Sequence, residues 1–264
     1  MDDILQQTLT AVSRAAAYLR FAYRAHAHGR IHKKGRADYV TDSDHTIQDM
    51  LIASLQDIKK GDIIAEEGEI FSQKGADFEW IIDPIDGTTN FIHKFPFVSI
   101  SVALRGKEEG LLMGVVANAI ADDVYYALKG QGAYKNGRKL NVSSVSALDS
   151  AFIATGFPFR HPEAVSRYTR LFQRLLQRVA GMRRAGSAAL DLALTAEGVF
   201  DGFFDYGLKP WDVAAGILLV QEAGGSVSGF AKHQRPLYDS RILATNGKVH
   251  NAMLQEIGHI FHEA

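Results

Sequence analysis

The chain opens with hydrophobic residues at the spacing of an α-helix. Leu5, Leu9 and Val12 lie four and three positions apart, and this pattern predicts an amphipathic helix over residues 4–23. The basic, glycine-containing stretch that follows, residues 28–38, is too polar and too irregular for a buried element. We predict that this stretch is a surface loop.

A second helical pattern follows the basic stretch. Its hydrophobic face consists of Ile47, Met50, Leu51, Leu55 and Ile58. Ser43 or Asp42 is a suitable N-cap for this helix, because a short polar side chain accepts a hydrogen bond from a free backbone N–H group. Asp44 then lies in the first turn, where the helix dipole favours a negative charge.

From residue 63 the hydrophobic runs become short and rich in β-branched and aromatic residues, which is typical of strands. The runs are separated by Gly, Asp and Asn and comprise residues 63–67, 80–83, 97–104, 111–120 and 123–130. Such closely spaced runs predict an antiparallel sheet. The pair Asn136-Gly137 comes next and predicts a tight turn.

Strands and helices alternate in the second half of the chain. The predicted strands comprise residues 151–157, 199–205 and 242–246, and the predicted helices comprise residues 163–179, 186–198, 211–225 and the C-terminal segment. Neither an internal repeat nor a Pro-rich linker separates the two halves. We therefore predict one α+β domain over residues 1–264, layered around a continuous core, with an N-terminal half (about 1–148) and a C-terminal α/β half (about 149–264).

The composition narrows the class of protein. The 264 residues are 47% hydrophobic and 22% charged, as in globular proteins, and the formal net charge of −1 gives no support for general binding to nucleic acid or anionic membranes. The chain has no cysteine, which excludes disulfides, zinc–thiolate sites and cysteine nucleophiles. Its acidic start differs from a signal peptide, and no run approaches the roughly 20 apolar residues of a membrane span. We expect a cytoplasmic protein that does not associate with membranes.

Acidic residues mark the ends or beginnings of several predicted elements. They are Glu66, Glu67, Asp83, Asp86, Asp205 and Asp212. Carboxylates close to buried strand ends repel one another unless a cation lies between them. Magnesium suits such a site, because it binds a few carboxylates together with waters and substrate phosphate.

Residues 80–90, WIIDPIDGTTN, combine two of these carboxylates with other useful groups. Pro84 stiffens the backbone between the aspartates, so that the carbonyl of Ile85 is able to point at the same ion. Gly87 lets the backbone approach a ligand closely, and free N–H groups at a helix start favour phosphate. The threonine hydroxyls that follow are suited to orienting a water. Phosphoryl transfer uses such a set, often with two metals about 3.5–4 Å apart.

Each of these motifs alone also has a structural interpretation. Asp-x-x-Asp-Gly is common in turns and helix caps, and a Glu-Glu pair is common in solvated loops. Trp211-Asp212 before an apolar helix is suited to an N-cap with an aromatic anchor. The ten histidines lack paired spacing and receive no role. The functional interpretation depends on the motifs occurring together and in this order.

The segments AEE, DPIDGTTNF, GSAALDLAL, DGFFDYGLKPWDVAAG and EAGG together resemble the inositol monophosphatase family of magnesium-dependent, lithium-sensitive phosphatases. The phrases ATGFPF and LKPWDVAAG are most similar to its bacterial SuhB-type branch. The resemblance covers essentially the whole chain. It implies the layered αβαβα sandwich of the inositol monophosphatase and fructose-1,6-bisphosphatase type, a homodimer, and a site between the layers.

The resemblance implies two or three Mg²⁺ ions for each subunit. By matched position, Glu66, Asp83 and the carbonyl of Ile85 hold the first ion. Asp83, Asp86 and Asp212 hold the second. A weaker third ion depends on Glu66.

The resemblance also implies the catalytic residues Thr88, Asp44 and Glu66. Asp44 pairs with Thr88, and together they activate the water that attacks the phosphorus, while Glu66 holds the ion that binds this water. Lys33 matches a lysine of a mobile loop near the third ion. The water-activating role of Asp44 comes from the resemblance, since the pattern of the chain places it only in a first helical turn.

Several positions match substrate contacts of the family. They are Asp86, Gly87, Thr88, Gly186, Ser187, Ala188, Asp205 and Asp212. The backbone of the Gly-Thr pair matches phosphate-binding positions, and the residues from 186 to 188 and at 205 match positions that contact the alcohol. Two departures stand out: Asp205 is commonly glutamate in the family, and Ala65 replaces a glycine before the Glu-Glu pair.

The implied reaction is the hydrolysis of myo-inositol monophosphate to inositol and phosphate. Because Asp205 is shorter than glutamate, other small esters stay open: fructose-1,6-bisphosphate, histidinol phosphate, the 2′-phosphate of NADP or a nucleotide 3′-phosphate. The basic segments 28–38 and 174–184 leave open a regulatory role in transcription or RNA metabolism, with a protein or nucleic-acid partner.

Overall fold

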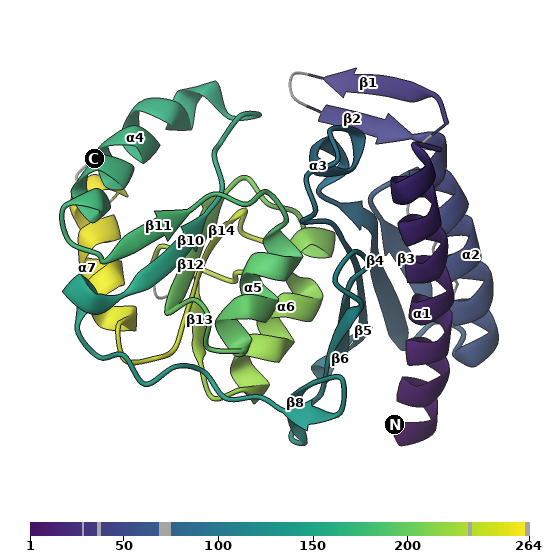
Figure 1. Cartoon of the computed structure of the whole chain (residues 1–264). Helices are drawn as coiled ribbons and strands as arrows, with labels where there is room; N and C mark the ends of the chain where they lie inside the picture. The colour runs from purple at the N-terminus through teal and green to yellow at the C-terminus, as the bar shows by residue number, and fades with distance from the viewer. Residues whose placement is uncertain (28, 36–37, 69–74, 232–233, 262–264) are drawn as a thin grey trace.

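The computed structural model describes residues 1–27, 29–35, 38–68, 75–231 and 234–261. The chain is arranged in five layers, which alternate between helices and sheets and follow one another from right to left in Figure 1. This is the αβαβα arrangement that the family resemblance implies, and it confirms the layered α+β fold predicted from the hydrophobic pattern.

The first layer consists of α1 (Asp2–Ala25) and α2 (Asp42–Ile58). Both helices place their hydrophobic faces on one side of a seven-stranded sheet, where Leu19, Leu51 and Trp80 are fully buried. In spatial order the strands of this sheet are β3 (Asp62–Ala65), β4 (Phe78–Asp86), β5 (Ser99–Gly106), β6 (Gly110–Asn118), β7 (Asp123–Leu128), β8 (Gly132–Lys135) and β9 (Arg138–Lys139).

Strands β4 to β9 pair antiparallel, as predicted, but β3 runs parallel to β4, so that the prediction is wrong for this edge strand. A parallel neighbour needs a longer connection than a hairpin turn, and the hydrophobic pattern of a strand is the same in either orientation. The tight turn between β8 and β9 is confirmed. Asn136 and Gly137 both have positive φ angles there, 49° and 81°.

The middle layer consists of α5 (Ala188–Ala196) and α6 (Pro210–Glu222), which lie between the two sheets. Helix α6 is apolar on nearly all sides because both of its faces are covered. Its approach to the seven-stranded sheet is very close at Gly114 of β6. A Cβ atom at Gly114 would lie 2.7 Å from the carbonyl oxygen of Ala215, so only glycine fits.

The second sheet has five strands, in the order β11 (Gly181–Arg183), β10 (Phe152–Thr155), β12 (Gly202–Tyr206), β14 (Arg241–Thr245) and β13 (Ser226–Ser228). The last layer, α4 (Pro162–Leu176) and α7 (His250–Phe261), covers its outer face through a third hydrophobic cluster. The strands and helices predicted for the second half of the chain are thus confirmed, with shifts of a few residues at their ends.

Two predictions near the start of the chain are wrong. The stretch 28–38, whose residues 28, 36 and 37 lie outside the described part, is not a loop, because it contributes β1 (Ile31–Gly35) to a two-stranded sheet with β2 (Asp38–Thr41). An exposed hairpin needs backbone pairing rather than a hydrophobic pattern, and β1 has almost none.

The N-cap of α2 is Thr41 rather than Asp42 or Ser43. The backbone N–H of Thr41 donates to Asp44 Oδ2 at 2.8 Å, so Asp44 turns back over the start of its own helix. Asp42 instead accepts a hydrogen bond from the N–H of Arg30 at 2.9 Å. None of the helices in the described part of the chain combines the length and the hydropathy that a bilayer-spanning segment needs.

Candidate active site

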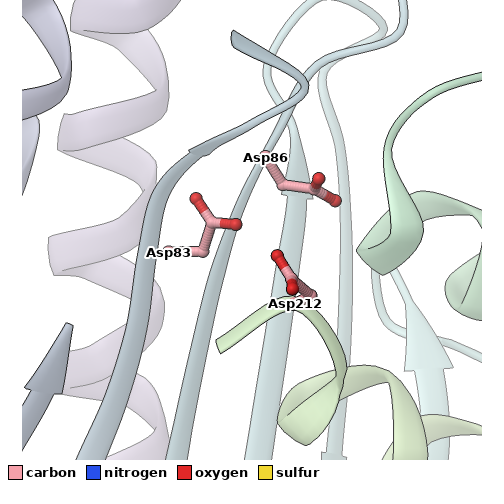
Figure 2. A group of neighbouring side chains, drawn as sticks. All are labelled: Asp83, Asp86 and Asp212. Carbon is pink, nitrogen blue, oxygen red and sulfur yellow. The ribbon is translucent and has the colours of Figure 1, made fainter. Parts of the chain in front are cut away.

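Three carboxylates meet between the seven-stranded sheet and the middle helices. Asp83 and Asp86 come from β4 and Asp212 comes from α6, and one oxygen of each lies within 4.8 Å of the others. Figure 2 shows the three side chains directed toward the same space. Asp212 lies more than a hundred positions after the other two in the sequence, and the packing of α6 on the sheet brings it to them.

An irregularity in β4 allows two aspartates of one strand to share this space. Residues three positions apart in a regular strand point to opposite faces of the sheet. Between Asp83 and Asp86 the register against β5 shifts, and Pro84, which lacks an N–H group, lies at this bulge. The N–H of Ile85 donates to Asp83 Oδ1 at 3.0 Å and fixes that side chain. The sequence predicts a strand that ends at Asp83, but β4 continues through Asp86.

Two of the three carboxylates, Asp86 and Asp212, also lie at the starts of the middle helices. Asp212 is the third residue of α6, and its Oδ2 accepts a hydrogen bond from the N–H of Lys209 at 2.6 Å. Asp86 Oδ2 accepts bonds of 2.7 Å from the hydroxyl of Ser187 and from the N–H of Ala189, at the start of α5. Helix dipoles favour negative charge at these positions. One oxygen of each carboxylate is thereby held in place.

Burial and mutual repulsion raise the pKa values of these groups. The pKa of Asp83 lies well above its usual value, because the side chain is buried and because Glu66, Asp86 and Asp212 are negative. Burial, followed by repulsion from neighbouring carboxylates, raises the pKa of Asp212 to about 7 and that of Glu66 to about 8. An excess of buried negative charge made of oxygen donors fits a hard dication such as Mg²⁺.

Thr88 and Asp44 lie beside the three carboxylates. The hydroxyl of Thr88, at the start of α3 (Thr88–Ile92), is 3.3 Å from Asp44 Oδ1 and 3.0 Å from the carbonyl oxygen of Ile85. Since the hydroxyl has one proton, it donates to one of them at a time. Burial raises the pKa of Asp44 to about 6, although its hydrogen bonds with Thr41 lower it. Asp44 is therefore an anion at neutral pH and is able to accept a proton above about pH 6.

Gly87 joins β4 to α3 in a conformation that favours glycine. Its φ angle is 95°, and a Cβ atom there would lie 3.0 Å from the carbonyl oxygen of Phe97 and 3.2 Å from that of Gly186. Both Gly87 and Thr88 line the pocket that contains the carboxylates. The predicted phosphate-binding backbone is thus placed next to the predicted metal ligands.

The residues that the resemblance assigns to the alcohol line the same pocket. They are Gly186, Ser187, Ala188 and Asp205. The hydroxyl of Ser187 is already bonded to Asp86, so its contribution is to orient that carboxylate. Asp205 packs directly against Gly156, where a side chain would collide with its carboxylate. Burial raises the pKa of Asp205 to about 7, and the charge of Arg184 opposes this rise.

One predicted residue does not lie beside the carboxylates in the structure. Lys33 is exposed on β1, and the next residue, Lys34, approaches the carboxylates instead. Its Nζ lies 2.5 Å from Glu67 Oε1 and 3.8 Å from Glu66 Oε1. Successive residues of a strand point to opposite faces, so Lys33 and Lys34 are directed to different sides of the hairpin.

Several pocket residues were not predicted from the sequence, and Arg184 and Asp191 are two of them. Asp191 is buried in α5, and its Oδ1 has no hydrogen-bond partner among the residues that the structure describes. The available signal was an aspartate within the otherwise apolar run SAALDLAL. Arg184 gave no signal beyond its place in a basic segment.

Known proteins are similar to this chain over nearly its full length. The sequence profile of the inositol monophosphatase family matches residues 1–261. The protein named Nus factor SuhB from Pseudomonas aeruginosa is 42% identical over 232 residues, which are 86% of this chain and 85% of the relative. The inositol-1-monophosphatase of Caulobacter vibrioides is 36% identical over 231 residues, which are 86% of this chain and 90% of the relative.

The fold has close counterparts among solved structures. The crystal structure of the extragenic suppressor protein suhB from Bartonella henselae superimposes with a TM-score of 0.92 at 33% sequence identity, covering 96% of this chain and 98% of that one. The sequence profile, the relatives and the fold agree. The chain belongs to the inositol monophosphatase family, in its SuhB-type branch, and members of this family are magnesium-dependent phosphomonoesterases.

Proposed function

We propose that this protein hydrolyses myo-inositol monophosphate to inositol and phosphate and that it requires magnesium for this reaction. The observation that carries the proposal is the meeting of Asp83, Asp86, Asp212 and Thr88 in one pocket, with the buried Asp44 within 3.3 Å of the Thr88 hydroxyl. The relative named inositol-1-monophosphatase supports the choice of substrate. We infer that the protein acts as a homodimer, as the family resemblance implies.

The metal ligands follow from the donor set. Glu66, Asp83 and the carbonyl of Ile85 would hold one Mg²⁺, and Asp83, Asp86 and Asp212 a second, with Glu66 available to a third. Bound magnesium supplies neutralisation of the phosphate oxygens and a lower pKa for an attacking water. The raised pKa values of these carboxylates support this assignment, because they signal charge that the described part of the protein does not compensate.

The protein's own groups position the phosphate and move a proton. Backbone N–H groups at Gly87 and Thr88 bind the phosphate. The hydroxyl of Thr88 donates to Asp44, which directs its lone pair toward the proton of the attacking water. That water passes a proton through the Thr88 hydroxyl to Asp44 and forms a new P–O bond opposite the ester oxygen, while the P–O bond to the alcohol breaks. The departing oxygen takes a proton from a second water, and the hydroxide that remains recovers a proton from Asp44.

Two alternatives stay in view. The shorter side chain of Asp205 makes another small ester a candidate, such as fructose-1,6-bisphosphate, histidinol phosphate or the 2′-phosphate of NADP. Relatives named Nus factor SuhB suggest an additional role in transcription. The second role would be separable from catalysis.

A phosphate-release assay on purified protein tests the proposal. The panel contains myo-inositol 1-phosphate and the three alternative esters, with magnesium titrated in the presence and absence of lithium. We expect magnesium-dependent, lithium-inhibited release that is fastest with the inositol ester. A higher kcat/KM for another ester would replace the substrate, and no release from any ester would overturn the phosphatase proposal. Recovery of transcription components by both the wild type and an inactive variant would support the second role.

A further inference from the structure

We propose that Arg184 and Asp191, together with Asp205, determine substrate specificity by recognising two neighbouring hydroxyl groups of the alcohol. This inference rests on the proposed function and deepens it. The three residues come from the segment after β11, from α5 and from β12, and all of them line the pocket that contains the metal-ligand candidates.

Arg184 is held in place without using its hydrogen-bond donors. Its guanidinium carbon lies 5.6 Å from the ring centre of Phe157 and 5.3 Å from that of Phe159. A Cβ atom at Gly186 would lie 2.5 Å from Arg184 Nη1, so glycine at that position makes room for the guanidinium. Among the described residues Arg184 has neither a hydrogen bond nor an ion pair. Its planar set of N–H donors is therefore available to a ligand.

Asp191 supplies the complementary group. Its side chain is only 2% exposed, and its Oδ1 has no hydrogen-bond partner within the described part of the chain. Buried carboxylate oxygens are normally bonded, because an unsatisfied one destabilises the fold. Asp191 lies close enough to Arg184, Asp86 and Asp205 to feel their charges. The unpaired acceptor and the unpaired donors thus belong to one neighbourhood.

The charges of this neighbourhood indicate which alcohol it suits. Two carboxyl groups and the guanidinium of Arg184 lie in this part of the pocket, whose lining also includes Arg160 and His161. A cationic amine would meet the positive charge of Arg184. A hydroxyl group is neutral and both donates and accepts hydrogen bonds. Two adjacent hydroxyls are therefore able to donate to the carboxyl groups and to accept from the guanidinium. The chemistry favours a polyol over an amino alcohol.

The chain offers a matched control for Arg184. Its neighbour Arg183 is also exposed and also stacks on a phenyl ring, with its guanidinium carbon 4.7 Å from the ring centre of Phe152. Arg183 does not line the pocket. Arg183→Gln removes the same charge from the same segment without removing the proposed contact.

The test compares two esters across the wild type, Asp191→Asn, Arg184→Gln and Arg183→Gln. The esters are myo-inositol 1-phosphate and 4-nitrophenyl phosphate, whose leaving group has no neighbouring hydroxyls. We expect kcat/KM for the inositol ester to fall about 10- to 100-fold in Asp191→Asn and Arg184→Gln, mainly through KM, as for loss of a hydrogen bond to a charged group. Turnover of 4-nitrophenyl phosphate and all activities of Arg183→Gln should stay within about twofold of the wild type.

Three outcomes would overturn the inference alone, provided that the wild type hydrolyses the inositol ester. They are equal losses on both esters, no loss on either, and a loss in Arg183→Gln as large as that in Arg184→Gln. If the wild type hydrolyses neither ester, both the proposed function and this inference are contradicted. Thermal unfolding of Asp191→Asn checks the fold. We expect no loss of stability, because the substituted oxygen has no partner.

Discussion

Asp83, near the end of β4, and Asp201, just before β12, are both buried aspartates, 1% and 4% exposed, but their hydrogen bonding differs. Asp201, just before β12, accepts a hydrogen bond from the N–H of Phe152 at 2.7 Å and another from the hydroxyl of Ser143. Asp83 accepts one bond from Ile85 and otherwise faces other carboxylates. The first is bonded within the protein, and the second is left for a ligand.

The same difference separates Glu256 from Asp212. Glu256 of α7 is 4% exposed and accepts hydrogen bonds or ion pairs from Arg174 Nε at 2.8 Å and Arg178 Nη1 at 3.1 Å, so it fastens α7 to α4. Asp212 has one bond to the backbone N–H of Lys209 at the start of its helix, and burial and the charge of Asp86 raise its pKa although Arg160 and Lys209 oppose the rise. A buried carboxylate stabilises a fold when its partners belong to the protein, and destabilises it when they do not.

The largest expected effect follows from neutralising the shared carboxylate. We expect Asp83→Asn to lower magnesium-dependent phosphate release about a thousand-fold, since bound metal supplies several kcal/mol of transition-state stabilisation. The same substitution should raise the thermal unfolding midpoint of the metal-free protein, because it removes a repelled buried charge. Activity assays and differential scanning calorimetry measure the two effects. Activity within tenfold of the wild type would contradict the view that Asp83, unlike Asp201, serves as a metal ligand.

A smaller effect concerns magnesium and pH. In the folded, metal-free protein the pKa of Glu66 is about 8 against a usual 4.5, and that of Asp212 is about 7 against 3.8. The folded state therefore binds more protons than the unfolded state between about pH 4 and pH 8, so stability falls as the pH rises through this window.

Magnesium should offset this loss. At about 100 times its dissociation constant it stabilises by about 2.7 kcal/mol, or roughly 5 °C or more for a chain of this size. We expect the increase in the unfolding midpoint to be larger at pH 8 than at pH 6, because protons compete with the ion at the lower pH. A magnesium effect that is equal at both pH values would contradict the assignment of Glu66 and Asp212 as ligands.

The smallest effect concerns the bonded carboxylate. Asp201→Asn replaces one acceptor oxygen by a donor that faces either the N–H of Phe152 or the hydroxyl of Ser143. We expect a loss of about 2 kcal/mol in the free energy of unfolding, measured by urea denaturation. Magnesium-dependent activity below the unfolding transition should be unchanged. A stable Asp201→Asn variant would show that the two kinds of buried carboxylate differ less than their hydrogen bonds indicate.

The sequence predicted most of the fold because helices and strands have distinct hydrophobic periods. It failed at β1, which is exposed and has no such period, and at the direction of β3, which the period does not encode. For the site, the motifs indicated which carboxylates to consider. The bulge between Asp83 and Asp86 was not predictable, because it depends on the register against β5.

The unpaired oxygen of Asp191 was equally hidden. Whether a buried acceptor has a partner depends on the side chains that surround it in space, and the partners of Asp86, such as Ser187 and Ala189, come from a helix a hundred residues away. Periodicity alone does not distinguish Asp191, whose Oδ1 lacks a partner among the residues that the structure describes, from Asp201, which has two.

The close approach at Gly114 has a consequence for the metal site. Asp83 and Asp86 belong to a sheet and Asp212 belongs to a helix that rests on it, so the distance between helix and sheet is also the width of the candidate site. Ala215, which touches Gly114, is three residues after Asp212 on α6. The absence of a side chain at Gly114 of β6 thus sets the distance between the aspartates of the sheet and the aspartate of the helix. A methyl group at this position would push α6 away from the sheet and widen the candidate site.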